Sequence, residues 1–164
     1  MAQLDIDFSK QYLEWLKQNI EQYQVRDSIF RITLPFLDRN NDCVEVYIVD
    51  NGDGTYQITD DGATINDLEF SGFDIETSER RKKILNSIIA AYGITRLDTN
   101  ELVVKCTRDD LPLKKHMLAQ CMVLLTQHPD MISFGFQQVS HSNETVRSKE
   151  EATSKTYPTG AAFM

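Results

Sequence analysis

The chain is 164 residues long and carries a formal net charge of −8, with 41% apolar and 26% charged residues. This length and apolar content suffice for one folded domain, and the low glycine and proline content excludes a collagen-like or low-complexity chain. No apolar run approaches the length of a membrane-spanning helix, and the N-terminal residues lack the basic-then-apolar order of a signal peptide. The three cysteines, Cys43, Cys106 and Cys121, fit no zinc or disulfide spacing. We therefore expect a cytoplasmic protein with free thiols.

The acidic residues are concentrated in one segment of the chain. Between Asp38 and Glu79 there are twelve acidic residues and one basic residue, Arg39, which gives this segment a net charge of −11. Such a segment argues against direct nucleic-acid binding, because phosphates require concentrated positive charge. An acidic surface of this kind could bind a divalent cation or a basic protein partner, or could imitate a nucleic-acid backbone. The more ordinary interpretation is a solvated surface that keeps the protein in solution.

The N-terminal half predicts one helix followed by strands. Apolar residues recur at three- and four-residue steps over residues 7–24, which predicts a helix with Trp15 as an anchor in the core. Alternating apolar residues then indicate strands, and Asn51-Gly52-Asp53-Gly54 indicates a tight turn between the second and third of them. These strands are predicted over residues 28–35, 42–49 and 55–60.

The C-terminal half predicts helices around a second hairpin. A short helix is expected over residues 63–70 and a longer one over 77–92, before hairpin strands at 94–97 and 101–106. A last helix is expected from Asp109-Asp110 to about residue 127. Its apolar face is predicted to consist of Leu113, Met117, Cys121, Leu124 and Leu125.

Strands and helices that do not alternate regularly predict an α+β fold. We expect a mostly antiparallel sheet of about five strands with three to four helices packed on one face. Residues 1–132 are expected to form a single domain, with the helix over 7–24 packed on it. Residues 133–164 are expected to form a polar, flexible tail, because residues 140–158 are rich in Ser and Thr and nearly free of aromatic residues.

Several carboxylates are expected to converge at one end of the sheet. If the strands over 42–49 and 55–60 pair through the tight turn, Asp42 and Asp60 become neighbours, with Asp38 and Asp61 close by. Converging carboxylates can hold Mg²⁺, although the lysine arrangement of restriction nucleases is absent from the sequence. The alternative is that these side chains bond nearby backbone N–H groups. We refer to the candidate binding residues as the acidic rim: Asp38, Arg39, Asp42, Asp60, Asp61 and Asp67.

No other catalytic motif occurs in the sequence. There is no phosphate-binding glycine loop and no Gly-x-Ser-x-Gly turn, and no histidine is spaced with a cysteine for metal binding. The segment from Asp50 to Gly54 lacks the oxygen ligands of a calcium loop. The sequence therefore points to no cofactor, leaves a metal open, and favours a non-enzymatic role.

A family resemblance rests on several collinear motifs. They are Ile32-Thr33-Leu34-Pro35-Phe36-Leu37-Asp38-Arg39-Asn40-Asn41-Asp42, Tyr56-Gln57-Ile58-Thr59-Asp60-Asp61-Gly62, Thr64-Ile65-Asn66-Asp67-Leu68, Arg81-Lys82-Lys83-Ile84-Leu85-Asn86 and Pro112-Leu113-Lys114-Lys115-His116. With these motifs, residues 29–125 resemble the uncharacterised bacterial and phage family named domain of unknown function 1828. The resemblance implies bacterial chromosomes, mobile elements and a bacterial host cell as the setting, and implies no established activity.

Different classes of function remain open at this point. The first is a non-enzymatic acidic binding protein of a phage or mobile element that inhibits or modulates a host defence nuclease. Its partner would be a basic or nucleic-acid-binding protein, and an exposed edge strand would also allow a homodimer. The alternatives are a Mg²⁺-dependent nucleic-acid-processing enzyme that uses Asp38, Asp42, Asp60 and Asp61, or a regulatory domain of unknown partner.

Overall fold

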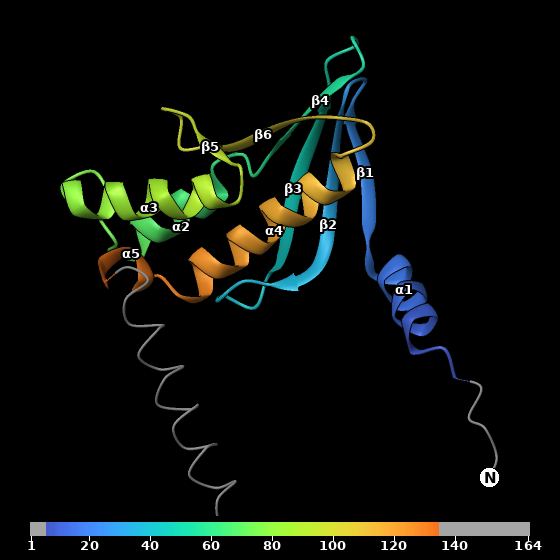
Figure 1. Ribbon diagram of the computed structural model, residues 1–164, viewed down its shortest axis with the longest axis horizontal. Helices are drawn as coiled ribbons and strands as arrows, with labels where there is room; N and C mark the ends of the chain where they lie inside the picture. Colours follow the sequence, from blue (N-terminus) through green and yellow to red (C-terminus); the bar gives the residue numbers. More distant parts are fainter. Residues whose placement is uncertain (1–5, 135–164) are drawn as a thin grey trace, which may run out of the picture.

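The computed structural model describes residues 6–134, which form one sheet with helices on one of its faces (Figure 1). The strands are β1 (Glu21–Arg26), β2 (Ile29–Leu37), β3 (Cys43–Asp50), β4 (Thr55–Thr59), β5 (Thr95–Arg96) and β6 (Leu102–Thr107). The helices are α1 (Phe8–Asn19), α2 (Ala63–Phe70), α3 (Glu79–Ala91), α4 (Leu111–Gln127) and α5 (Met131–Phe134).

All neighbouring strands of the sheet are antiparallel, in the order β1-β2-β3-β4-β6-β5. The turn between β3 and β4 forms as expected, because Gly52 and Gly54 both adopt positive φ. After β4 the chain forms α2 and α3 and then returns through β5 so that β6 lies beside β4. The predicted α+β class is thus confirmed, with six strands where about five were expected.

The additional strand is β1, which corrects the expected helix over residues 7–24. The helix ends at Asn19, and residues 21–26 instead form a strand paired with β2. Gln, Tyr and Val tolerate either conformation, so the nonlocal pairing with β2 decides the outcome. Tyr23, which the helical pattern includes, lies on this strand with the Arg31 guanidinium 5.6 Å from its ring centre.

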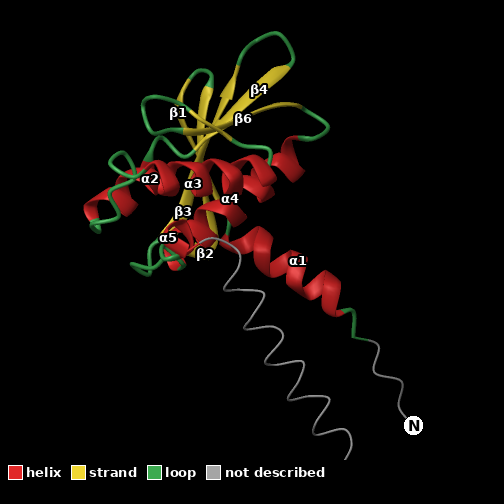
Figure 2. Ribbon diagram, turned by 60° about the vertical axis from the view of Figure 1, so that its left-hand side comes forward, coloured by secondary structure: helices red, strands yellow, loops and turns green. Residues whose placement is uncertain are grey.

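The prediction that Trp15 anchors the core is wrong. Its side chain is 48% exposed, and α1 contains no buried residue. The indole instead stacks on Tyr12, with the ring centres 6.3 Å apart. Figures 1 and 2 show the reason, because α1 projects away from the face of the sheet that the other helices cover.

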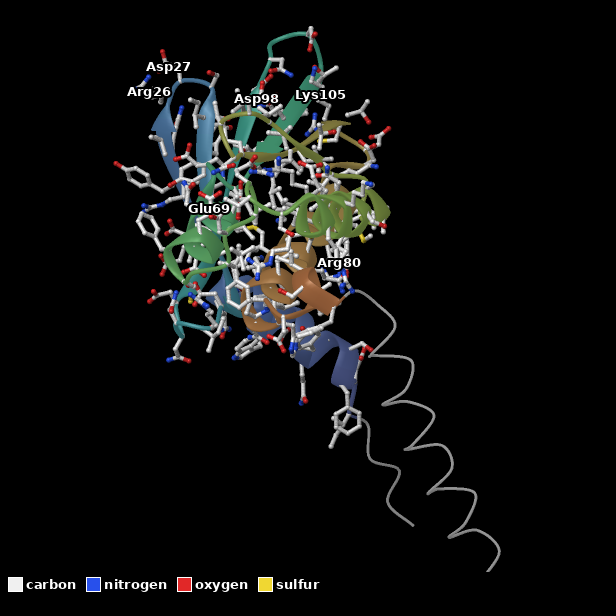
Figure 3. All side chains as sticks on the ribbon, turned by 90° about the vertical axis from the view of Figure 1, so that its left-hand side faces the viewer. Arg26, Asp27, Glu69, Arg80, Asp98 and Lys105 are labelled. Carbon is white, nitrogen blue, oxygen red and sulfur yellow. The ribbon has the colours of Figure 1, made fainter. Side chains whose placement is uncertain are left out.

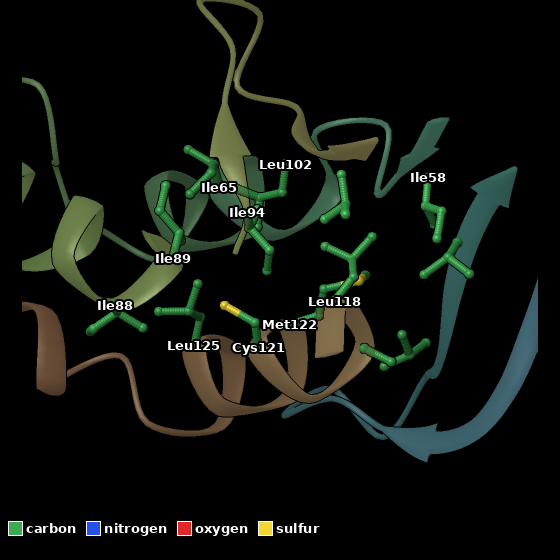
Figure 4. Close-up of a cluster of buried hydrophobic side chains, with 14 of the residues drawn as sticks. Ile58, Ile65, Ile88, Ile89, Ile94, Leu102, Leu118, Cys121, Met122 and Leu125 are labelled. Carbon is green, nitrogen blue, oxygen red and sulfur yellow. The ribbon is translucent and has the colours of Figure 1, made fainter. Parts of the chain in front are cut away.

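The core lies between the sheet and the helices that follow it. Alternate residues of β2 and β3, among them Ile32 and Val46, point to the covered face, where α4 contacts β2, β3, β4 and β6. The buried face of α4 differs from the prediction, since Leu113 is exposed while Leu118 and Met122 are buried. Figure 4 shows Leu118, Cys121, Met122 and Leu125 pointing into this core. The helix is apolar around much of its circumference, so its position against the sheet selects the face.

The helix α5 was not predicted from the sequence. It contacts α3, and its Ile132 is completely buried. It includes the first two residues of the expected polar tail, and the rest of that tail, residues 135–164, lies outside the described residues. None of the described helices is both long and apolar enough to cross a membrane.

Candidate functional site: an acidic cavity

The five aspartates of the acidic rim line an open cavity of about 490 Å³ at the end of the sheet where β3 begins and β4 ends. The β3–β4 register pairs Tyr47 with Thr59, so residues 43–46 of β3 extend beyond β4 and are paired with β2. The cavity occupies the space beside this part of β3. It is lined by Asp38, Asp42, Cys43, Val44, Glu45, Tyr47, Asp60, Asp61, Ala63, Thr64, Asp67, Met122 and Thr126.

Asp38 organises the loop between β2 and β3. Its Oδ1 accepts hydrogen bonds from the backbone N–H groups of Asn40 (2.8 Å) and Asp42 (3.0 Å). The Asp38 N–H in turn donates to the carbonyl of Asp42 at 2.9 Å, and Asn41 adopts a positive φ of 67° within the loop. These are the bonds by which Asp commonly closes a turn, so the Asp38 carboxylate is largely committed to the loop.

The same loop is attached to α2 through Asp67. The Arg39 guanidinium lies 3.1 Å from Asp67 (Nε to Oδ2) and donates from Nη2 to Oδ1 at 3.5 Å, while the Asn40 amide donates to that Oδ1 at 3.1 Å. The expected pairing of Arg39 with a carboxylate is therefore present. Because Arg39 neutralises Asp67, most of the negative charge at the cavity comes from the other carboxylates.

Asp60 is buried at the corner between β4 and α2, with 1% of its surface exposed. Its Oδ1 accepts from the N–H groups of Leu102 (2.8 Å) and Gly62 (3.0 Å), and its Oδ2 accepts from the N–H of Thr64 (3.0 Å). Burial raises the pKa of the Asp60 carboxyl, and these N–H donors partly offset the increase. Asp60 thus extends the β4–β6 pairing and caps the start of α2, where Gly62 takes the positive φ of 79°.

Asp42 and Asp61 are the carboxylates of the acidic rim that remain free. Both are exposed, and within residues 6–134 neither carboxylate receives a hydrogen bond or an ion pair. Asp61 adopts a positive φ of 54°, and its N–H donates to the Thr59 hydroxyl at 3.0 Å, so its backbone is fixed while its carboxylate stays free. These two residues supply the unpaired negative charge of the cavity, since Oε1 of Glu45 lies 3.7 Å from Nε of Arg31 and accepts from the Thr33 hydroxyl at 3.3 Å.

The arrangement differs from a metal centre. Among the described residues, no three His, Cys, Asp or Glu side chains are placed to hold a metal ion. The carboxylates of Asp38 and Asp60 are directed to backbone N–H groups, and Asp67 is paired with Arg39. For Asp38 and Asp60, the geometry matches the alternative in which an aspartate bonds nearby backbone N–H groups, whereas the Asp42 and Asp61 carboxylates make no such bond within residues 6–134.

Sequence reasoning missed several residues of the cavity wall. Met122 and Thr126 come from α4, and the sequence alone does not show where this helix packs against the sheet. Glu45 and Tyr47 were visible as the polar positions of an alternating strand, although nothing showed that β4 would end before reaching residue 45. The exposed thiol of Cys43 also lies in this wall, and it offers a natural position for a chemical probe.

A family model for the domain of unknown function DUF1828 matches residues 34–124, which is more than half of the chain and includes the whole acidic rim. The chain belongs to this family. No curated protein and no solved structure matches this chain. The match begins within β2 and ends within α4, so α1 and β1 precede the part that is shared with the family.

Proposed function

We propose that this member of the DUF1828 family is a non-enzymatic binding protein whose acidic cavity takes up basic side chains of a protein partner. In a phage or mobile-element setting, we propose a nucleic-acid-binding protein as the partner, in particular a nuclease of the host's defence. Such enzymes hold concentrated positive charge to bind phosphates, and an acidic protein can compete for that surface.

The observation that carries the proposal is the free charge at the cavity. Asp42 and Asp61 both line the open cavity and are unpaired within residues 6–134, while Glu45 is paired with Arg31 and the carboxylates that fix the loops are already bonded. A lysine or arginine entering the cavity would gain the Asp42 and Asp61 carboxylates as acceptors without breaking any bond that maintains the fold.

The neighbouring backbone of β3 supports a more specific form of partner. Residues 43–46 pair with β2 on one side and with no described strand on the other, and Cys43, Val44 and Glu45 among them line the cavity. An extended segment of a partner could add to this edge through main-chain hydrogen bonds, and its basic side chains would then meet Asp42 and Asp61. We therefore propose an extended basic segment as the element that is recognised.

Binding can be tested with a short oligolysine peptide and the full chain. Titration calorimetry should detect binding that weakens with salt, and the peptide should slow the modification of Cys43 by a thiol reagent. The double variant Asp42→Asn/Asp61→Asn should weaken binding by roughly tenfold, the equivalent of about 1.4 kcal/mol. The matched control Asp98→Asn/Asp109→Asn removes the same charge away from the cavity and should bind as the wild type does.

The choice of partner needs a separate experiment in bacteria. Expression of the full chain in a host that carries a defence nuclease should increase phage or plasmid survival, and the nuclease should be recovered with the protein in a pull-down. Unchanged survival without a stable protein partner would remove the proposal. Titration with Mg²⁺ or Mn²⁺ alone tests the enzymatic alternative, since clear binding abolished by Asp60→Asn would favour that alternative instead.

A further inference from the structure

The N-terminal arm, defined as α1 with β1, has an unusually apolar exposed surface. Among the large apolar side chains exposed in the described residues, seven lie between residues 6 and 25. They are Ile6, Phe8, Tyr12, Leu13, Trp15, Tyr23 and Val25. Isolated exposed apolar residues are ordinary, whereas a concentration of this kind in one segment indicates an interaction surface.

The same arm carries the long free edge of the sheet. β1 pairs with β2 on one side, and in the described structure no strand lies on its other side. All six of its residues are exposed, so neither face is covered by the helices. Figure 3 shows Arg26 and Asp27 at the tip of this hairpin, well clear of the body of the domain. The opposite edge, β5, has only two residues.

We propose that two copies of this chain associate through the N-terminal arm, with their β1 strands paired antiparallel about a two-fold axis at Tyr23. A free edge strand is a template for another strand, and proteins that stay monomeric cover or interrupt such edges. Here the middle of the strand, from Gln22 to Val25, is uncharged.

The register of β1 makes it complementary to itself. Glu21, Tyr23 and Arg26 pair with alternate residues of β2, so the three side chains share one face. Arg26 reaches that face because the pairing shifts between Gln24 and Arg26, where Val25 is an extra residue. In a two-fold pairing centred on Tyr23, in which Val25 stays unpaired as it does against β2, Glu21 of each copy lies opposite Arg26 of the other. Two ion pairs of opposite charge would then flank the axis.

The exposed area is consistent with a stable dimer. Phe8, Tyr12, Trp15 and Tyr23 are 73%, 55%, 48% and 62% exposed. With 150–250 Å² for each aromatic side chain, they leave roughly 500 Å² of aromatic surface in water. A standard interface buries about 800 Å² on each partner. The remaining apolar residues of the arm and the strand backbone can supply the difference, and α1 leads directly into β1, so pairing brings both helices against the joined strands.

Charge exchange between Glu21 and Arg26 tests the proposal on the full chain. Light scattering after size exclusion should give twice the monomer mass for the wild type. Glu21→Arg and Arg26→Glu each place like charges opposite one another, and each should weaken the dimer by about tenfold or more. The double variant Glu21→Arg/Arg26→Glu restores opposite charges and should restore the dimer. Both residues are exposed, so folding should be unchanged by circular dichroism.

Trp15 provides an independent readout because it is the single tryptophan of the chain. Its emission should shift to longer wavelength as the protein is diluted and the dimer dissociates. A monomer at every concentration, a dimer unaffected by the single reversals, or a double variant that stays monomeric would overturn the proposal. Blue-shifted emission that is independent of concentration in a monomer would also overturn it, because another part of the chain would then cover the arm.

Discussion

Asp60 provides the sharpest test of how the corner between β4 and α2 is stabilised. Its carboxylate accepts three backbone N–H groups, from Gly62, Thr64 and Leu102, and the site is almost completely buried. Bonds of this kind to a charged group are each worth about 1.5–3 kcal/mol, and a buried donor left without an acceptor costs about 1–3 kcal/mol. These contributions do not simply add, because removing the carboxylate also removes the cost of burying its charge.

Two substitutions of Asp60 separate these effects. Asp60→Ala removes both acceptor oxygens and thus all three hydrogen bonds, and we expect a loss of about 4 kcal/mol in the free energy of unfolding. Asp60→Asn keeps Oδ1 for Leu102 and Gly62 but directs an NH₂ group at the N–H of Thr64, so we expect about 2 kcal/mol. Asp61→Asn is the matched control. It is exposed, and Asn tolerates its positive φ, so its effect should stay within about 0.5 kcal/mol.

Urea unfolding followed by far-ultraviolet circular dichroism measures these differences. Trp15 emission is unsuitable because this residue lies on the exposed arm rather than in the core. If Asp60→Ala and Asp60→Asn both fall within about 0.5 kcal/mol of the wild type, the three hydrogen bonds do not hold the corner together and the reasoning is refuted.

Three further predictions concern pH, the thiols and α5. Burial raises the pKa of Asp60 above 3.8. At a pH between 3.8 and the raised pKa, the folded state therefore keeps a proton on Asp60 that the unfolded state has released. The contribution of Asp60 to the free energy of unfolding thus increases as the pH falls through this range. When urea unfolding is measured from neutral pH down to about pH 4, the free energy of unfolding of the wild type should increase relative to that of Asp60→Asn. A relative decrease would contradict the predicted direction of the pKa shift. Burial raises the pKa of the Cys121 thiol to about 12, so a thiol reagent should modify the exposed Cys43 rapidly and Cys121 only after unfolding, as peptide mapping would show. Ile132→Ala should cost about 2–4 kcal/mol because the side chain is completely buried, whereas Phe134→Ala, in the same helix but 55% exposed, should change urea unfolding by less than about 0.5 kcal/mol.

The elements with strong local signals were predictable from the sequence. The tight turn at Asn51–Gly54 needs residues that accept positive φ, and the helix over residues 63–70 has the bounds that its pattern indicates. The buried faces of β2 and β3 follow from the alternation of apolar and polar residues, as in β3, where Val44 and Val46 are buried and Glu45 is partly exposed. The candidate site was partly predictable for the same reason, since pairing through a recognised turn brings the start of β3 and the end of β4 to one end of the sheet, where Asp42 and Asp60 both line the cavity. The register does not place these two residues opposite one another, because residues 43–46 of β3 extend beyond the Tyr47–Thr59 pair.

The remaining features depend on contacts between distant segments. The apolar spacing that predicts a helix continues to Tyr23, but pairing with β2 makes residues 21–26 a strand. Trp15 belongs to an apolar stripe that no other element covers, and the buried face of α4 is fixed by where the sheet lies beneath it. The environment of Asp60 depends on β6, which brings the N–H of Leu102 from a segment more than forty residues away.

Backbone preferences and hydrophobic periodicity are local properties, so the sequence alone determined most helices, the turns and the class of fold. Which apolar surface is buried, and which carboxylates meet, are decided by nonlocal pairing and packing. Those contacts form only when the whole sheet and its helices come together, and this is why the acidic cavity and the exposed N-terminal arm became visible only in the tertiary structure.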